Sequence, residues 1–174
     1  MGISHKIRKH KPQIASINLR NFIFGVEDSL VSTVGLLAGV AAADMSHMAV
    51  VITGLILIVV EGLSMGIGSF LTEETTEEMS GSKLKRVKAI HGGIVMLLSY
   101  CLAGLVPLWP YYYFPGDKAV IISVISSLLG LFILGTGTAI YYHKRRPWSR
   151  GFKMFVMGGL ATLVGMAVGK LFHI

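Results

Sequence analysis

Five long apolar segments follow one another along the chain, separated by short polar connections. Each has about the length that a helix needs to cross the hydrocarbon core of a bilayer. The segments are Asn21–Ala43, Met48–Leu71, Ala89–Trp109, Ala119–Tyr142 and Phe152–Phe172. This pattern predicts an all-α integral membrane protein with five transmembrane helices in residues 21–174, preceded by a basic segment in residues 1–20.

The composition agrees with a membrane protein and excludes several other classes. Hydrophobic residues make up 53% of the chain and charged residues only 14%, with a mean hydropathy of +0.67. The apolar segments are too numerous and too long for a cleaved signal peptide. A nucleophile elbow, a phosphate-binding loop and a zinc signature are all missing, so we expect no enzymatic activity and no permanently bound cofactor.

The chain has a net charge of +7, and its basic residues are distributed unequally between the two sides of the predicted membrane. Fourteen of the 16 Lys and Arg residues fall in the N-terminal segment and in the second-to-third and fourth-to-fifth loops. Only Lys118 and Lys170 fall on the other side. By the positive-inside rule, the N-terminus is predicted to be cytoplasmic and the C-terminus outside. The basic surplus thus indicates topology, and no nucleic-acid partner is expected.

Three carboxylates lie inside the first two apolar segments, Glu27 and Asp28 in the first and Glu61 in the second. An ionised carboxylate near the bilayer centre costs about 3 kcal/mol on insertion scales, so such residues are by default functional. The Asp44–His47 connection is short enough that the two helices are expected to pack antiparallel. We therefore predict a polar site between them that handles a cation, a proton or both.

Helical geometry places a sulfur ligand beside one of these acids. Asp28 lies about 12 Å past Arg20 along the first helix, and Met65 lies about 10 Å before Thr72 along the second, so both have similar depth. Glu61 lies one turn deeper on the Met65 face. Carboxylate with thioether suits a transition metal such as Fe²⁺ better than Mg²⁺ or Ca²⁺. Taken alone, Met65 is more typical of a residue that fills core or lipid-facing space.

Metal binding by carboxylates implies a link to protons, because a carboxylate must lose its proton before it binds a metal. Glu27 points about 100° away from Asp28 around the helix, so the two cannot face one site equally. We expect Glu27 either to pair with Arg20 or to lie at a seam between subunits.

An acidic run follows the second apolar segment, in the loop predicted for residues 73–88. If the second helix continues past the membrane, its glutamates stack one turn apart as two pairs, Glu73 with Glu77 and Glu74 with Glu78. One interpretation is a site that collects cations for transport. The other is a solvated helix end whose charge is balanced by Lys83–Lys88.

Small residues and prolines predict further details of packing. Glycine pairs four residues apart, as in Gly35/Gly39, Gly62/Gly66 and Gly165/Gly169, give smooth faces on which another helix packs closely. Such a face also suits an oligomer interface. The prolines Pro107, Pro110 and Pro115 are predicted to stop the third helix.

Three segments resemble the vacuolar iron transporter family, whose five-helix carriers include plant nodulin-like proteins. The run from Phe24 to Thr33 with Gly35–Gly39 resembles the signature of the family's first helix, and Leu63–Gly68 resembles that of the second. The stretch from Arg150 to Gly169 resembles the family's last helix. The resemblance implies a homodimer that exports Fe²⁺ or Mn²⁺ from the cytoplasm by proton exchange. It also implies that Asp28 and Met65 belong to the metal path.

The chain departs from the family pattern at several positions. Glu27 stands where Asn is common and Ser29 where Gly is usual. Ser69 replaces an acid, whereas Glu61 occupies a position that is usually small. The loop of residues 73–88 is too short for the family's glutamate-rich cytoplasmic domain, so we expect a short form that lacks this domain. The resemblance implies a prokaryotic cell membrane or a vacuole-type endomembrane. A non-transporting metal sensor or scaffold subunit is the alternative function.

Overall fold

The computed structural model describes residues 11–80, 86–143 and 146–172, which form five helices without a strand. The helices are α2 (Lys11–Ala42), α3 (His47–Ser80), α4 (Arg86–Tyr113), α5 (Asp117–Tyr141) and α6 (Pro147–Leu171). Each contains a stretch long and apolar enough to cross a membrane. The prediction of a five-span, all-α membrane protein is confirmed.

Two helices extend beyond the predicted spans. Helix α2 begins at Lys11, inside the segment predicted to precede the membrane domain, and Pro12 occupies its first turn, where a missing N–H is harmless. Helix α3 continues past Leu71 to Ser80, so the first half of the predicted loop 73–88 is helical. No Pro or Gly interrupts it from Ser69 to Met79, and each added residue gains a backbone hydrogen bond. Residues 1–10 and 81–85 lie outside the described part of the chain.

The prediction that proline stops the third transmembrane helix at position 107 or 110 is wrong. Both Pro107 and Pro110 lie inside α4, which ends at Tyr113, shortly before Pro115. Membrane helices tolerate internal proline where neighbouring helices supply hydrogen bonds. Helix α5 packs closely on this part of α4, where Ser123 donates a hydrogen bond of 2.6 Å to the carbonyl oxygen of Pro107.

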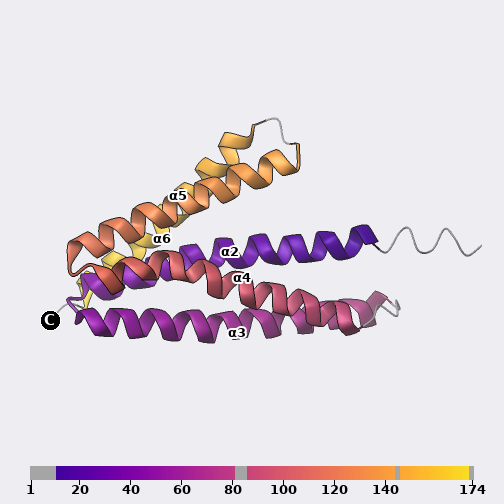
Figure 1. The fold of residues 1–174 in the computed structure, drawn as a ribbon, viewed down its shortest axis with the longest axis horizontal. Coiled ribbons are helices and arrows are strands. Elements are labelled where there is room, and N and C mark those ends of the chain that lie inside the picture. The colour runs from indigo at the N-terminus through magenta and orange to yellow at the C-terminus, as the bar shows by residue number, and fades with distance from the viewer. Residues whose placement is uncertain (1–10, 81–85, 144–145, 173–174) are drawn as a thin grey trace, which may run out of the picture.

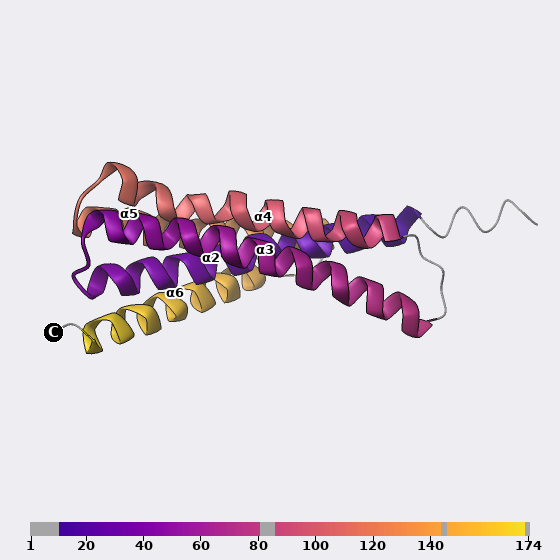
Figure 2. The ribbon, with the colours of Figure 1, turned by 90° about the horizontal axis from the view of Figure 1, so that it is seen from below.

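Helix α4 joins α2 to α3. It packs extensively against both α2 and α3, whereas α2 and α3 contact each other much less. The short turn through Asp44 does make α2 and α3 antiparallel, as predicted, but α4 fills most of the space between them. Figure 1 shows α2, α3 and α4 running side by side, with the α5–α6 pair diverging from them toward the α5–α6 connection. In the perpendicular view of Figure 2, α6 approaches α2 near the C-terminal end.

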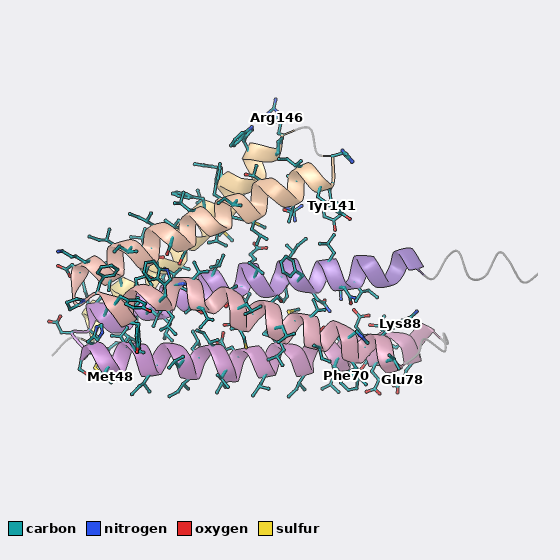
Figure 3. The ribbon with its side chains drawn as sticks, in the orientation of Figure 1. Met48, Phe70, Glu78, Lys88, Tyr141 and Arg146 are labelled. Atoms are coloured by element: carbon teal, nitrogen blue, oxygen red, sulfur yellow. The ribbon has the colours of Figure 1, made fainter. Side chains whose placement is uncertain are left out.

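The bundle has two chemically different ends. One carries Arg20, Lys88 and Arg146 and is called the basic end below, whereas the opposite end carries the α2–α3 and α4–α5 turns. Figure 3 shows Lys88, Glu78 and Arg146 toward the basic end and Met48 at the opposite end. The described chain begins at the basic end and finishes at the opposite one (Figure 1), as an odd number of spans requires.

Small residues make up much of the face that α5 and α6 turn toward the bundle. The buried face of α5 includes Ser123, Ser127 and Gly135, while Ile121, Ile125 and Leu129 are exposed. Lipid is as apolar as leucine, so helices associate through small residues that allow close approach. On α6, Gly165 and Gly169 pack against α2, which confirms the predicted packing role of this glycine face.

Candidate functional site

A hydrogen-bonded cluster joins three helices in the middle of the bundle. Glu61 of α3 is half-buried and accepts a hydrogen bond from the hydroxyl group of Tyr100 on α4. The same hydroxyl lies 2.7 Å from the Oγ of Ser32 on α2. Ser29, one turn earlier on α2, donates a hydrogen bond of 2.6 Å to the backbone oxygen of Tyr100. The cluster therefore ties Glu61 to α2 through α4.

Asp28 belongs to the same neighbourhood. It is half-buried on α2, one turn before Ser32, and its carboxylate interacts electrostatically with that of Glu61. The polar site predicted between the first two helices therefore has both acids in it. The site also contains the Tyr100 hydroxyl of α4, which was not among the site residues predicted from the sequence.

Met65 lies in a different cavity, toward the basic end. This cavity has a volume of about 620 Å³ and is formed by α2, α3 and α4. Its lining residues include Arg20, Phe24, Met65 and Met96, and Asp28 is not among them. Asp28 and Met65 were expected to share one site at equal depth, but they do not line the same cavity. Met96 supplies a second thioether to this cavity.

Glu61 opens into a larger groove that extends toward the opposite end. The groove has a volume of about 820 Å³ and lies between α2, α3 and α6. Glu61 and Ser32 lie at its inner part, and Met45 and Phe172 lie at its outer part. Most of the remaining lining is apolar or glycine. Glu61 and Met65, one helical turn apart on α3, thus face two cavities that extend toward opposite ends of the bundle.

Glu27 has a different partner from the one considered in the sequence. Its carboxylate interacts electrostatically with Arg150 of α6 and with the neighbouring Asp28. Of the two alternatives for Glu27, pairing with Arg20 is not found, because Arg20 forms an ion pair with Glu73. The helix continues through Glu73, which brings that residue opposite the start of the α2 span. The position of Glu27 at a seam between subunits stays a prediction.

The acidic run is only partly open to an ion. Glu73 is largely buried in its pair with Arg20, with 13% of its side chain exposed. Glu74 is half-buried and Glu78 is exposed, while Glu77 lies in α3 and its side chain is outside the described part of the structure. Among the described side chains, no three His, Cys, Asp or Glu residues are close enough together to hold a metal ion. The i, i+4 spacing of Glu73 with Glu77 and of Glu74 with Glu78 is therefore not enough by itself to form a metal site.

Several site residues were not found from the sequence. Tyr100 carries a usable signal, because it lies near the middle of a span, whereas the other tyrosines lie near span ends. Asn21 is almost fully buried and donates hydrogen bonds to the Ser69 Oγ at 2.8 Å and to the Gly92 carbonyl oxygen at 3.1 Å. Arg150 and Met96 carry no such signal, because only the packing of α6 and α4 brings them to α2.

Comparison with known families decides what kind of protein carries this site. A family model described as the VIT family matches residues 19–91 and 75–170, which include most of every helix. This chain belongs to the VIT family. The two matched ranges overlap in residues 75–91, where α3 ends and α4 begins.

Curated relatives of this VIT-family chain are similar along most of their length. Vacuolar iron transporter 1 of Eucalyptus grandis is 22% identical, with 87% of this chain and 85% of the relative covered. Vacuolar iron transporter 1 of Arabidopsis thaliana is 21% identical, with 97% and 91% covered. Vacuolar iron transporter homolog 1 of Oryza sativa subsp. japonica is 30% identical, with 88% and 73% covered.

The lengths of these alignments reveal a difference in size between this chain and some of its relatives. The alignments with the Eucalyptus and Arabidopsis proteins span 213 and 230 residues, more than the 174 residues of this chain. The alignment with the Oryza homolog spans only 172 residues. The first two relatives therefore contain residues without a counterpart here. Family membership and the five apolar helices together identify a multi-pass membrane protein that transports metal ions rather than an enzyme.

Proposed function

We propose that this VIT-family protein carries Fe²⁺, Mn²⁺ or both out of the cytoplasm in exchange for protons. The names of its relatives support iron as a cargo, and Mn²⁺ is included because the resemblance of the helix signatures to the family implies it. The membrane is a vacuole-type endomembrane or a prokaryotic cell membrane. The homodimer is proposed from the resemblance of the helix signatures to the family.

The observation that carries this proposal is the position of Asp28 between two cavities. Phe24, one turn before Asp28, lines the cavity that contains Met65, and Ser32, one turn after it, lines the groove that contains Glu61. An ion that moves from one cavity to the other passes this turn of α2. Acids inside membrane helices mark ion pathways because their burial is costly.

The ligands along this route change from soft to hard. The cavity toward the basic end offers the thioethers of Met65 and Met96, whereas the groove begins at the carboxylate of Glu61 with Asp28 and Glu27 on the neighbouring helix. Borderline transition-metal ions accept both kinds of ligand. Because these carboxylates bind metal only when deprotonated, release of the metal favours uptake of protons, which supports antiport.

The direction of transport rests on charge. The described Lys and Arg residues gather mainly at the basic end, which the positive-inside rule places in the cytoplasm. The acidic run on α3 also lies there, and we assign Glu73, Glu74, Glu77 and Glu78 a role in attracting metal to the entrance. The assignment does not require them to form a closed metal site.

Reconstituted protein tests the proposal directly. Proteoliposomes with an imposed pH gradient should take up Fe²⁺ or Mn²⁺ faster than protein-free vesicles, and Co²⁺ and Zn²⁺ define the selectivity. Movement of metal should change the luminal pH if protons are exchanged. Metal uptake without a pH change would refute antiport, and the absence of uptake for every metal would refute transport. A metal sensor would instead bind metal and lose its function on mutation of the acidic run but not of Asp28.

A further inference from the structure

Tyr100 is an unusual residue for its position. It lies near the middle of α4, its side chain is fully buried, and no packing role requires its hydroxyl group. The other described tyrosines lie near the ends of α4 and α5, where amphipathic rings prefer the membrane interface. A buried hydroxyl in a membrane core is costly unless it is hydrogen-bonded. Its partners therefore indicate what it does.

The hydrogen bonds of Tyr100 have a fixed direction. A phenol has one proton to donate, and Tyr100 gives it to Oε2 of Glu61. The hydroxyl of Ser32, 2.7 Å away, must then be the donor to the Tyr100 oxygen. The order is Ser32 to Tyr100 to Glu61. Ser29 holds the backbone of Tyr100 at the same time, so α2 fixes both the ring's hydroxyl and its main chain.

This chain of hydrogen bonds restricts how Glu61 can bind an ion. One of its two carboxylate oxygens already accepts the hydrogen bond from Tyr100. Glu61 lines the groove between α2, α3 and α6, where an ion would approach it. The Tyr100 proton competes with such an ion for the first oxygen, so binding through the second oxygen alone is favoured.

Single-oxygen binding discriminates between divalent ions. Ca²⁺ takes six to eight oxygen ligands and commonly uses both oxygens of a carboxylate. First-row transition-metal ions bind with fewer, stronger ligands, including nitrogen and sulfur. A site in which one carboxylate oxygen is already hydrogen-bonded therefore disfavours Ca²⁺ more than it disfavours Fe²⁺.

We propose that Tyr100 is a positioning residue that sets metal selectivity, because its hydroxyl keeps Glu61 from binding an ion through both oxygens. The inference rests on the proposed function, since it concerns ions that pass Glu61. Removal of the Tyr100 hydroxyl leaves both Glu61 oxygens free to bind an ion. The site then offers a more oxygen-rich shell, which admits Ca²⁺.

Substitution of the tyrosine by phenylalanine tests this idea without changing the packed ring. In proteoliposomes that take up Fe²⁺, with Ca²⁺ added as a competitor, Tyr100→Phe should lower the inhibition constant of Ca²⁺ by about tenfold. The KM for Fe²⁺ should change much less. Ser32→Ala removes the hydrogen bond to the Tyr100 oxygen and thereby weakens the linked bond from Tyr100 to Glu61, so it should change the inhibition constant in the same direction by a smaller factor. It also provides a second test if Tyr100→Phe does not insert properly.

Tyr111→Phe is the matched control. It removes a buried hydroxyl from the same helix, but Tyr111 packs in a different cluster with Leu37, Val50 and Ala119. Unchanged Ca²⁺ inhibition in Tyr100→Phe, or an equal change in Tyr111→Phe, would overturn the inference. Wild-type vesicles that take up neither Fe²⁺ nor Mn²⁺ would refute the proposed function, and the inference with it. Wild-type uptake with unaltered selectivity in the variant refutes the inference alone.

Discussion

Arg20 of α2 and Glu73 of α3 form an ion pair that ties the two helices together at the basic end. Just inside this pair, Asn21 donates hydrogen bonds to Ser69 of α3 and to the Gly92 carbonyl oxygen of α4. Arg20, Asn21 and Ser69 all line the cavity that contains Met65. The rim of this cavity is therefore held by directed polar contacts, and the Glu73 carboxylate at the rim is already paired with Arg20.

The acidic run should affect the capture of metal rather than the maximal rate. Replacement of Glu73, Glu74, Glu77 and Glu78 by Gln should raise the half-saturating metal concentration and leave maximal flux nearly intact. Among single variants, Glu78→Gln should raise it by about twofold, because exposed charges contribute weakly. Glu73→Gln should have a smaller effect, since Arg20 neutralises that carboxylate. Flux measured against metal concentration checks this, and an unchanged curve in the quadruple variant would make the run a solvated helix end.

Asp28→Asn should abolish flux while the protein still folds and inserts. The amide keeps the size and hydrogen-bonding capacity of the side chain but lacks the charge that a divalent ion needs. Uptake by the variant should fall to the level of protein-free vesicles, with an unchanged elution profile in detergent. Asp117→Asn, which alters an acid at the first turn of α5, is the control and should retain flux. Wild-type rates in Asp28→Asn would remove this residue from the mechanism.

Glu61→Ala should also impair flux, because it removes the carboxylate that lies at the inner part of the large groove. The truncation also breaks the buried hydrogen bond from Tyr100 and leaves its hydroxyl with Ser32 as partner, which costs about 1 kcal/mol. The double variant Glu61→Ala/Tyr100→Phe should therefore regain thermal stability without regaining flux. Measured melting temperatures and initial rates separate the two effects. Full flux in the double variant would show that Glu61 has only a structural role.

The contact between α2 and α6 should be sensitive to a single methyl group. A Cβ on Gly165 would overlap the carbonyl oxygen of Gly35, and a Cβ on Gly39 would lie 2.7 Å from the carbonyl oxygen of Gly165. Gly165→Ala should destabilise the protein by about 1–3 kcal/mol, the typical cost of overpacking. Gly159→Ala on the same helix is the control, because a Cβ added there would meet nothing within 4 Å. Equal thermal unfolding of the two variants would contradict this close packing.

The orientation in the membrane is the last prediction. The positive-inside rule places the basic end in the cytoplasm, and five spans then place the C-terminus outside. A topology reporter fused after Ile174 should therefore read as non-cytoplasmic, and one fused before Met1 should read as cytoplasmic. The opposite result for the C-terminal fusion would reverse the proposed direction of transport.

The sequence by itself determined the five helices, because a bilayer requires long apolar segments, and their length and composition can be recognised without tertiary contacts. It also determined that Asp28 and Glu61 need an explanation, since acids are rare within membrane helices. The glycine faces were readable as well, because close helix approach requires small residues at regular spacing. All three features depend on local sequence and on the solvent, not on which helices become neighbours.

Only the tertiary structure decided which side chains meet. The depth of Asp28 and Met65 was estimated from helical rise, but the rotation of α2 and α3 around their axes and the insertion of α4 between them place the two residues in different surroundings. The same insertion brings Tyr100 to Glu61, and the extension of α3 brings Glu73 to Arg20. Helix rotation and neighbour choice depend on the sum of many weak packing contacts across the whole bundle, which no single stretch of sequence contains.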